Sequence, residues 1–537
     1  MTVLSDAEKK GQADQNNEKE EDLMDLVGGD GPWQRWLFLV ILLCPIPDAA
    51  HNMSMSFFAP NIDYWCQRPP DLNISVEEWK TLALPADDQH CSRYKHINLT
   101  HIHKKSFYHN DSNNPTIPCD SWEFDDSVYK STVLGKFNLV CSREWLISMS
   151  KAIFIAGYFV SNTIFGFLSD KIGRRPVVVL SDVIAVIAAI ACVFSTSYHM
   201  FVLCRFFIAA GVLGVDNTMF VLLMEIIGPR NRSVYGIAAQ SGWGVGCALL
   251  TIFAWYFRDW VWIHLAITVP SIILLSSWWI FPESPRWLLT HGKTDEALKI
   301  LTEAAKRNGK TSNITEAKIK DFVAKASKEQ KSKNSSGNIL QLFKPGLLRS
   351  TLIVFFLWSV NGFIYYGISY NTNDLAGDAF LNFAICGVIE IPAQFMTLFV
   401  IQSKGRRNPL AISLAAAGVS CLLVYIIPKD PAWASEALML VGKFCVTASF
   451  SIIYIFTAEI FPTTVRNAGL GAASVSGQIG SIAAPFMREL GRTTHPMVPH
   501  IVYGILAAAG SGLVLLLPET NNCIVPDTLQ EATDINR

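Results

Sequence analysis

Glu390 and Asp216 each lie inside an apolar stretch that is long enough to cross a bilayer. Glu390 is the only charged residue of segment 381–401, and Asp216 is the only one of segment 207–223. A charge near the bilayer midplane costs about 2.5–3.5 kcal/mol on insertion scales, so such an acid is a functional candidate. We predict that both carboxylates are counter-charges for a cationic substrate, unmatched by a protein cation. The alternatives are a protonated or paired Glu390, and an Asp216 paired with Arg205 of the same helix.

Aromatic side chains accompany these acids at helical spacing. Trp358 and Tyr365 are seven residues apart, or two helical turns, so they share a face with Asn361 between them and Tyr366 adjacent. An aromatic face attracts an ammonium ion by about 0.5–2 kcal/mol. We therefore predict that these residues contribute to the cation site, with plain helix packing as the alternative. Weaker cavity candidates are Gln240, Trp243, Phe220, Tyr454 and Ser474.

The composition indicates a polytopic membrane protein. Of the 537 residues, 50% are hydrophobic and 17% charged, whereas soluble globular chains carry about 25% charged residues. The net charge of −1 gives no reason to expect a nucleic acid partner. No nucleophile–base arrangement and no Walker motif occurs, so we predict neither an enzyme nor ATP-driven transport, and no cofactor. The loop histidines His96, His101 and His103 lack the acids or cysteines that would complete a site, so no metal is predicted.

Apolar runs of about 20 residues are long enough to cross a bilayer as helices. The sequence contains twelve of them, at 33–56, 146–168, 177–195, 199–222, 234–256, 262–281, 349–370, 379–401, 410–427, 434–457, 468–490 and 498–518. Two long polar stretches, 57–145 and 283–348, interrupt this series.

Basic residues set the predicted orientation. The short loops 169–176 and 403–409 are rich in lysine and arginine, and segment 283–348 has thirteen basic against seven acidic residues. Basic loops are retained on the cytoplasmic side. We therefore expect 57–145 outside the cell and both termini in the cytoplasm, in a multi-pass protein of the plasma membrane.

The polar stretch 57–145 carries the signs of an oxidising compartment. Four cysteines and three glycosylation sequons fall within it. They are Cys66, Cys91, Cys119, Cys141 and the sequons at Asn73, Asn98 and Asn110. We predict two disulfides, whose three pairings stay open, and glycans at the three asparagines. Free thiols are the alternative.

Internal repetition divides the chain into two halves. GRR occurs at 173–175 and 405–407, E-x6-R at 225–232 and 459–466, and PES at 282–284 is echoed by PET at 518–520. Three features in the same order at nearly one spacing predict two six-helix halves, with a substrate site between them. The predicted parts are a disordered cytoplasmic tail (1–32), an N-terminal half (33–281), a helical linker (282–348), a C-terminal half (349–518) and a second tail (519–537).

Several motifs resemble those of known transporters. GFLSDKIGRR (166–175) resembles the loop signature of the major facilitator superfamily, and PESPRWL (282–288) resembles a motif of its sugar porters. The cysteine-bearing loop, EIPAQF (390–395) and AEIFPTTVRNAGLG (458–471) are similar to the organic cation/carnitine transporter family. The chain is identified as a member of that family, closest to its invertebrate branch. The resemblance implies an all-α fold of twelve transmembrane helices in two pseudo-symmetric bundles.

The resemblance also implies roles for individual residues. A glutamate at the position of Glu390 is implicated in cation binding. The position of Gln478 holds an acid in the family's cation transporters and an arginine in its carnitine and anion transporters, so a glutamine matches neither group. A charge cluster that locks the two halves together in the outward-open state is implied for Asp170, Arg174, Arg175, Glu225, Arg232, Arg406, Arg407, Glu459 and Arg466. Plain topology-setting charge is the alternative for that cluster.

The predicted function is uptake of small organic cations by alternating access, driven by their gradient and the membrane potential. The first alternative is transport of zwitterions such as carnitine or a betaine, with ion coupling through Asp216 or Glu390 left open. A receptor that binds without transport is the second. The expected partners are a small organic cation and the lipid bilayer, and the sequence leaves homo-oligomer formation open.

Overall fold

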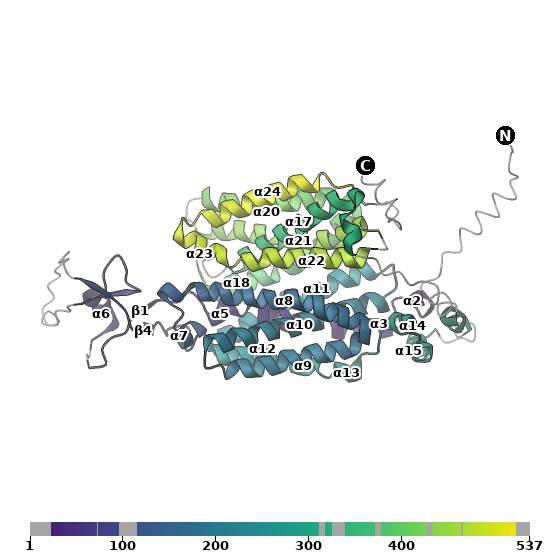
Figure 1. Ribbon diagram of the computed structural model, residues 1–537, viewed down its shortest axis with the longest axis horizontal. Helices are drawn as coiled ribbons and strands as arrows, with labels where there is room; N and C mark the ends of the chain where they lie inside the picture. Colours follow the sequence, from purple (N-terminus) through teal and green to yellow (C-terminus); the bar gives the residue numbers. More distant parts are fainter. Residues whose placement is uncertain are drawn as a thin grey trace.

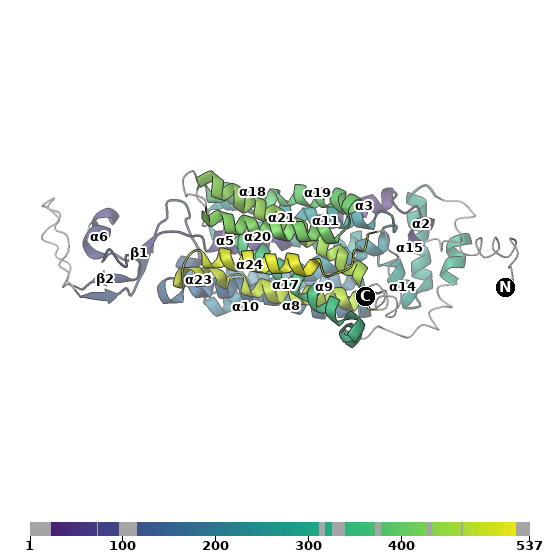
Figure 2. The ribbon, with the colours of Figure 1, turned by 90° about the horizontal axis from the view of Figure 1, so that it is seen from above.

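The structure is a long bundle of helices in two halves that lie side by side (Figure 1). This computed structural model describes residues 23–71, 74–95, 115–310, 317–324, 339–370, 377–426, 432–462 and 465–521. A small segment projects from one end of the bundle, which we call the loop end. The linker helices cover the opposite end, which we call the linker end, and a perpendicular view shows the same arrangement (Figure 2).

The N-terminal half contains six membrane-crossing segments, some of them broken into shorter helices. They are α3 (Pro32–Ile41), α4 (Pro45–Met53), α5 (Met55–Phe58), α8 (Trp145–Ile172), α9 (Arg174–Val193), α10 (Tyr198–Ile226), α11 (Arg232–Phe257), α12 (Trp260–Leu274) and α13 (Ser277–Ile280). Pro45 begins α4, and a proline at the first helical position fits because its missing N–H has no partner to lose there.

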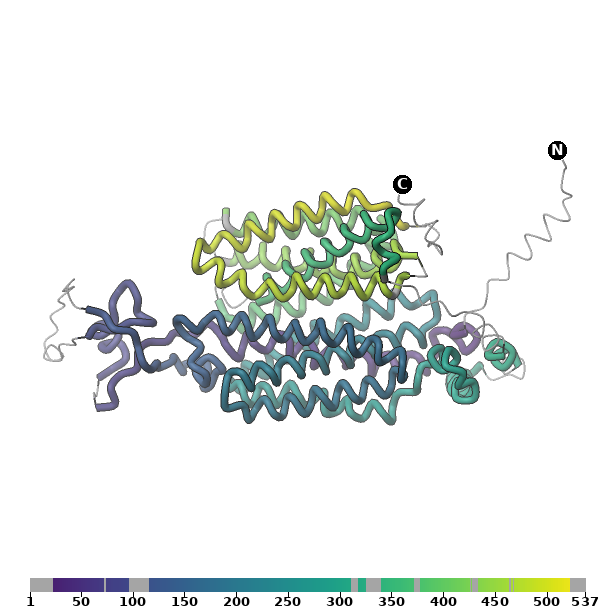
Figure 3. Tube along the Cα trace, viewed as in Figure 1, coloured from purple at the N-terminus to yellow at the C-terminus, as the bar shows by residue number. Residues whose placement is uncertain are grey.

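The C-terminal half repeats this arrangement. Its helices are α17 (Pro345–Tyr370), α18 (Ala379–Val388), α19 (Glu390–Lys404), α20 (Arg407–Ile426), α21 (Ala432–Ile460), α22 (Arg466–Ala483), α23 (Phe486–Thr493) and α24 (Val498–Val514). The chain trace shows that each half is formed by a continuous stretch of sequence (Figure 3). The predicted fold class is confirmed.

The twelve predicted spans all coincide with helices, but they are not equally apolar. Among the described residues, ten helical segments are long and apolar enough to cross a membrane, and Val498–Val514 is a shorter apolar helix. The predicted span 468–490 is divided between α22 and α23, and Pro485 precedes α23. Proline cannot donate the backbone hydrogen bond that a continuous helix needs there.

Part of the predicted disordered tail is folded. Residues 23–26 form the short helix α2 (Leu23–Leu26), and Leu23, Met24 and Val27 are buried. These side chains join an apolar cluster with Leu301 of α15 (Thr294–Arg307), which follows α14 (Pro285–Thr290) in the linker. The prediction of disorder is therefore wrong from residue 23 onward, because burial of three large apolar side chains stabilises this segment. The linker ends with η3 (Ile339–Phe343).

The loop segment is a small disulfide-bonded unit. Its elements are β1 (Tyr64–Cys66), α6 (Val76–Ala83), β2 (Ser92–Tyr94), β3 (Thr116–Pro118), β4 (Trp122–Phe124), α7 (Val133–Phe137) and η2 (Cys141–Arg143). Antiparallel pairs β1–β4 and β2–β3 form two small sheets. Trp79 is fully buried beneath them and donates its indole N–H to the Cys66 carbonyl at 2.8 Å.

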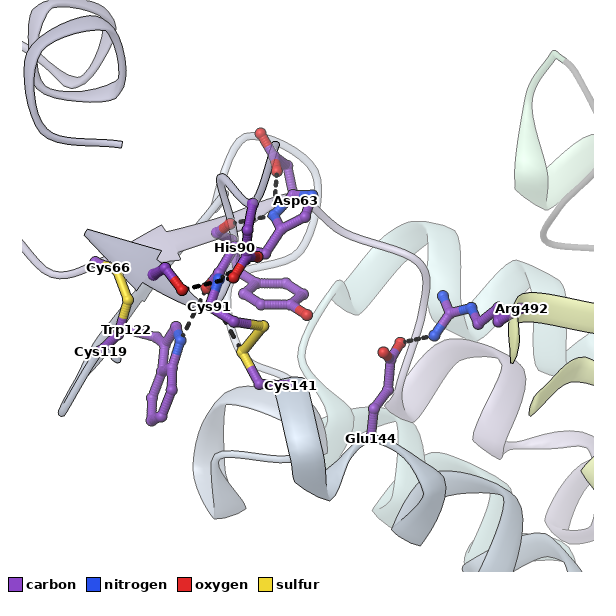
Figure 4. The surroundings of a disulfide bond; sticks show 12 residues. Asp63, Cys66, His90, Cys91, Cys119, Trp122, Cys141, Glu144 and Arg492 are labelled. Carbon is purple, nitrogen blue, oxygen red and sulfur yellow. Dashed lines mark hydrogen bonds and ion pairs between the residues drawn. A yellow bond between two sulfur atoms is a disulfide. The ribbon is translucent and has the colours of Figure 1, made fainter. Parts of the chain in front are cut away.

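Two disulfides hold this unit together, as predicted. Cys66 is bonded to Cys119 and Cys91 to Cys141 (Figure 4). The structure thus selects one of the three pairings that the sequence left open. The predicted glycosylation sites Asn73, Asn98 and Asn110, and the loop histidines His96, His101 and His103, lie outside the described residues.

This pairing leads to a direct chemical prediction. Proteolysis of the purified, unreduced protein is expected to release linked peptides that join Cys66 to Cys119 and Cys91 to Cys141, which mass spectrometry identifies. Because each bond closes a loop of about 50 residues, its loss is expected to destabilise the loop segment by about 4 kcal/mol. Linked peptides of either other pairing would contradict the structure.

Candidate functional site

The repeated sequence motifs form one structural module at the linker end of the N-terminal half. The Glu283 carboxylate accepts hydrogen bonds from the backbone N–H of Arg174 at 2.9 Å and of Arg175 at 3.2 Å. These are the first residues of α9, where N–H groups lack helical partners and the helix dipole favours an anion. The Arg174 guanidinium pairs with Glu225 at 2.8 Å and with the exposed Asp170 at 3.0 Å.

The C-terminal half contains the same module. Glu519 accepts from the backbone N–H of Arg406 at 2.9 Å and of Arg407 at 3.1 Å, and the Arg406 guanidinium pairs with Glu459 at 2.9 Å. The repeated sequence motifs therefore correspond to a repeated contact. In each half, the glutamate of the PES or PET motif accepts hydrogen bonds from the backbone at the helix start formed by GRR.

These ion pairs join residues of the same half. The predicted lock between the halves belongs to the outward-open state, and it stays a prediction for that state. Arg232 and Arg466 likewise bond within their own halves, to the carbonyls of Ile227 and Phe461. The Glu283 and Glu519 carboxylates thus fix each GRR helix start within its own half.

The two halves are joined by hydrogen bonds near the loop end. The Asn52 amide of α4 donates to the Tyr366 hydroxyl at 3.1 Å, and the Tyr370 hydroxyl donates to the Asn52 carbonyl oxygen at 3.0 Å. Both tyrosines belong to α17, in the other half. Asn52 is fully buried, so these bonds are protected from water. The Asn52 side chain thus connects the first and seventh spans.

Further contacts close the loop end around this connection. Glu144 of α8's N-terminal cap pairs with Arg492 of α23 (Figure 4). Ser148 donates to Glu489 at 3.1 Å, again across the halves. The Phe57 ring lies 4.9 Å from that of Phe383. These contacts and the Asn52 bonds close the loop end.

Asp48, an acid at the inner end of this network, was not predicted from the sequence. Asp48 of α4 is buried and accepts a short hydrogen bond from the Tyr158 hydroxyl, which in turn accepts from Asn52 at 2.9 Å. A chain of hydrogen bonds therefore runs from Asp48 to the residues that join the halves. The signal was available, because Asp48 is an acid within the first predicted span.

Asp216 lies where the two halves face each other. Its side chain is partly exposed, and among the described residues no hydrogen bond or ion pair engages its carboxylate. Phe220, one turn further along α10, has its ring 5.8 Å from that of Tyr454 on α21. Asp216 is within electrostatic range of Tyr454 and of Asp48. The alternative of a pair with Arg205 is not seen.

Arg205 is instead held near the loop end. Its guanidinium donates to the Ser54 hydroxyl at 2.7 Å and to the His51 carbonyl at 3.2 Å, and it lies 4.4 Å from the Phe154 ring centroid. These contacts explain why the eleven-residue spacing does not produce an ion pair with Asp216.

A polar bridge lies beside Asp216. The Asn217 amide donates to Asn162 of α8, and the Asn162 amide donates to Ser474 of α22 at 3.3 Å. Ser474, predicted from the sequence as a weak cavity candidate, thus bonds across the halves. Asn162 and Asn217 were not predicted, although both are amides within apolar spans.

Glu390 does not match the prediction of an unpaired acid. Its carboxylate is 2.8 Å from the Lys443 ammonium of α21, and both side chains are almost fully buried. The Tyr365 hydroxyl donates to the same carboxylate oxygen at 2.7 Å. The alternative of pairing within the bundle is therefore the one observed. A lysine in the apolar tenth span was the sequence signal for this partner.

The other aromatic and amide candidates are mostly engaged inside the C-terminal half. The Trp358 indole donates to Thr457 at 2.9 Å, and Asn361 bonds to Leu357 and Ser449. The Trp358 ring still lies 5.8 Å from Tyr454, so it backs the aromatic wall that faces Asp216. Asn361 is completely buried and its contacts are those of packing.

Three polar candidates keep unused hydrogen-bonding capacity. Gln240, Trp243 and Gln478 are partly exposed. The Trp243 indole nitrogen and the Gln478 carbonyl oxygen are shielded atoms without a hydrogen-bond partner in the described part of the chain. Gln478 thus offers a neutral amide and no charge.

The match to known proteins covers nearly the whole chain. A family described as sugar (and other) transporters matches residues 96–524. The organic cation transporter protein of Drosophila melanogaster is 35% identical over 525 residues, which make up 96% of this chain and 95% of that protein. The chain belongs to the organic cation/carnitine transporter family of the major facilitator superfamily. Organic cation/carnitine transporter 2 of Homo sapiens is 30% identical, over 94% of this chain and 92% of that protein.

Solved structures show the same fold. The proton:xylose symporter XylE superposes with a TM-score of 0.62 at 16% identity, over 94% of this chain and 99% of XylE. At this identity the likeness establishes the major facilitator fold alone. Membership of the organic cation/carnitine transporter family confirms that the chain is a multi-pass membrane transporter and not an enzyme.

The repeated module leads to a prediction with an internal control. Gly173 has φ +107, and an added Cβ would lie 2.5 Å from a Glu283 carboxylate oxygen. Gly173→Ala is therefore expected to lower the free energy of unfolding by about 1–3 kcal/mol, measured as a lower thermal midpoint in detergent. Gly166 lies inside α8, and a Cβ added there meets nothing within 4 Å, so Gly166→Ala is the control. An equal effect of both substitutions would contradict the role given to Gly173.

Proposed function

We propose that this transporter takes up small organic cations by alternating access and that Asp216 is the residue that holds the substrate's positive charge. The observation that supports this is a partly exposed carboxylate between the two halves, which no cation among the described residues neutralises. A charge without a partner inside the bundle is costly even when it is partly exposed, and a cationic substrate relieves that cost.

The surroundings of Asp216 suit an alkylammonium ion. Phe220 and Tyr454 supply aromatic surface, with the buried Trp358 ring packed behind Tyr454. Asn162, with Ser474, supplies neutral polar groups. Aromatic faces stabilise ammonium ions, and neutral hydroxyl and amide groups accept or donate hydrogen bonds without adding charge. The name of the Drosophila relative, an organic cation transporter protein, is consistent with this chemistry.

The contacts between the halves support alternating access. We place the loop end outside the cell and the linker end in the cytoplasm of a plasma-membrane protein, because disulfides form in oxidising compartments and the basic loops belong inside. With the Asn52 bonds and the Glu144–Arg492 pair formed, the outside entrance is closed. Opening requires these contacts to break while each half keeps its own charged module.

The membrane potential supplies a driving force for such a substrate. A single charge gains about 2.3 kcal/mol per 100 mV on entering a negative interior. Facilitated diffusion of a monovalent cation therefore needs no coupled ion.

Transport of a zwitterion is the second candidate, suggested by the name of the human relative. A substrate carboxylate needs a basic partner, and Lys443 is already bonded to Glu390 at 2.8 Å. Competition between choline and glycine betaine separates the candidates, since the two share a trimethylammonium group and differ in the hydroxyl or carboxylate. We expect choline to inhibit uptake of a labelled cation better than betaine does. Stronger inhibition by betaine would favour the zwitterion.

The role of Asp216 is tested by removal of its charge. Asp216→Asn is expected to reduce cation uptake at least about tenfold, since loss of one ion pair of about 1.4 kcal/mol has that effect. Initial uptake rates are normalised to protein at the cell surface. Asp295→Asn, the same substitution on the exposed face of linker helix α15, is the matched control and is expected to leave uptake unchanged. Full activity of Asp216→Asn would refute the proposal.

Closure of the loop end is tested at Tyr370. Tyr370→Phe removes one hydrogen bond to Asn52, so the outward-open population is expected to rise about two- to tenfold. Labelling of Ser148→Cys by an impermeant maleimide reports this opening, because Ser148 is 3% exposed in the closed arrangement. Tyr235→Phe, which removes a hydroxyl contact at the linker end, is the control. No difference in labelling between the two would contradict this gate.

A further inference from the structure

A buried lysine occupies a small cage in the C-terminal half. The Lys443 ammonium lies 2.8 Å from the Glu390 carboxylate and 2.6 Å from the Ser369 hydroxyl. The face of the Tyr365 ring is 3.4 Å away, measured to its centroid. Three groups from α17 and α19 therefore surround one cation that enters from α21.

The cage has the composition of a binding site for a small ammonium ion. A carboxylate supplies charge, an aromatic face supplies its quadrupole, and a hydroxyl accepts a further hydrogen bond. The Tyr365 hydroxyl also donates to the Glu390 oxygen that contacts Lys443, at 2.7 Å, which fixes the carboxylate and the ring relative to each other. The positions of the Glu390 carboxylate and the Tyr365 ring are thus held by their own hydrogen bond as well as by contact with Lys443.

The cage borders the interface between the two halves. Gly387 lies one turn before Glu390, and an added Cβ there would be 2.5 Å from Cβ of Cys247, which belongs to the N-terminal half. The Tyr365 ring lies 5.3 Å from that of Tyr366, which bonds to Asn52 across the halves. The cage is therefore next to the region in which a substrate meets both halves.

We propose that Lys443 is a built-in ligand, whose ammonium fills a cation subsite formed by Glu390, Tyr365 and Ser369. Glu390 is thereby withheld from the substrate, and Asp216 remains to meet it. Lys443 then determines specificity, because the site accepts a substrate with one positive charge and not two. The limit on substrate charge rests on the proposed function. The proposal that the Lys443 ammonium fills the cation subsite does not depend on that function.

The proposal can be tested by removing the Lys443 side chain and supplying a small amine of the same size. Lysine differs from alanine by three carbons and the ammonium nitrogen, so n-propylammonium replaces the atoms that Lys443→Ala removes. We expect the thermal midpoint of the purified full-length Lys443→Ala protein to be lower than that of the wild type. Millimolar n-propylammonium is expected to recover about half or more of that loss, as a ligand that binds the folded state does.

Two controls separate binding in the cage from general effects of the amine. n-Propanol has the same length without the charge, and it is expected to restore less than n-propylammonium. The variant Lys443→Ala/Glu390→Gln has the same cavity without the carboxylate, and it is expected to show no response specific to the ammonium ion. Equal responses to both compounds, or an equal response of both variants, would overturn the proposal.

Failure of Lys443→Ala to fold would still give a result. The cells are then grown with n-propylammonium, and recovery of folded protein is measured by size-exclusion chromatography. Recovery that requires the Glu390 carboxylate supports the proposal. No recovery, in conditions where Lys443→Ala/Glu390→Gln folds, overturns it.

The proposal that the site accepts a substrate with one positive charge and not two is tested by competition for cation uptake. Diammonium ions of increasing length are compared with monoammonium ions of equal length as inhibitors of uptake. In Lys443→Ala, the diammonium ions are expected to inhibit about tenfold more strongly, because one added ion pair contributes about 1.4 kcal/mol. In the wild type no such gain is expected. Absence of the gain in Lys443→Ala would refute the charge limit. Successful rescue together with full uptake by Asp216→Asn would instead refute the proposed function and leave the cage intact.

Discussion

Charge inside a low-dielectric bundle has to be matched, and this requirement explains most of the polar structure found here. Glu390 meets it within the protein, through Lys443 and Tyr365. Asp48 meets it with the hydroxyl of Tyr158. The Asp216 carboxylate has no such partner, since no described residue forms a hydrogen bond or ion pair with it. Removal of an ion from water costs several kcal/mol, so an acid left without a partner is a position where a ligand cation contributes most.

The same requirement divides the molecule into rigid and movable contacts. At the linker end, Glu283 and Glu519 cap equivalent helices, each within its own half. At the loop end, the hydrogen bonds of Asn52 and the Glu144–Arg492 pair cross from one half to the other. Each half can therefore move as a unit, and the contacts that must change lie between the halves. The chain from Asp48 through Tyr158 to Asn52 connects the substrate region with this closure.

A pair of opposite charges and a lone charge have different consequences for recognition. The Lys443–Glu390 pair is electrically neutral as a unit, so it exerts little net attraction on an ion. Under the proposed function, Asp216 supplies the attraction for the substrate and limits how many positive charges a substrate carries. Selectivity in this protein then depends on which acids have an internal partner as much as on which acids are present.

The sequence by itself determined the membrane class, the twofold repeat, the family and the acids worth attention, because these follow from composition, spacing and motif. It could not determine the partner of Glu390, since Lys443 is 53 residues away and meets it only when α19 and α21 pack together. It likewise left the disulfide pairing open, and it did not show that Arg174 and Arg406 pair with Glu225 and Glu459 within their own halves. Only tertiary structure decides such matters, because pairing depends on distance in space, and helix packing sets that distance.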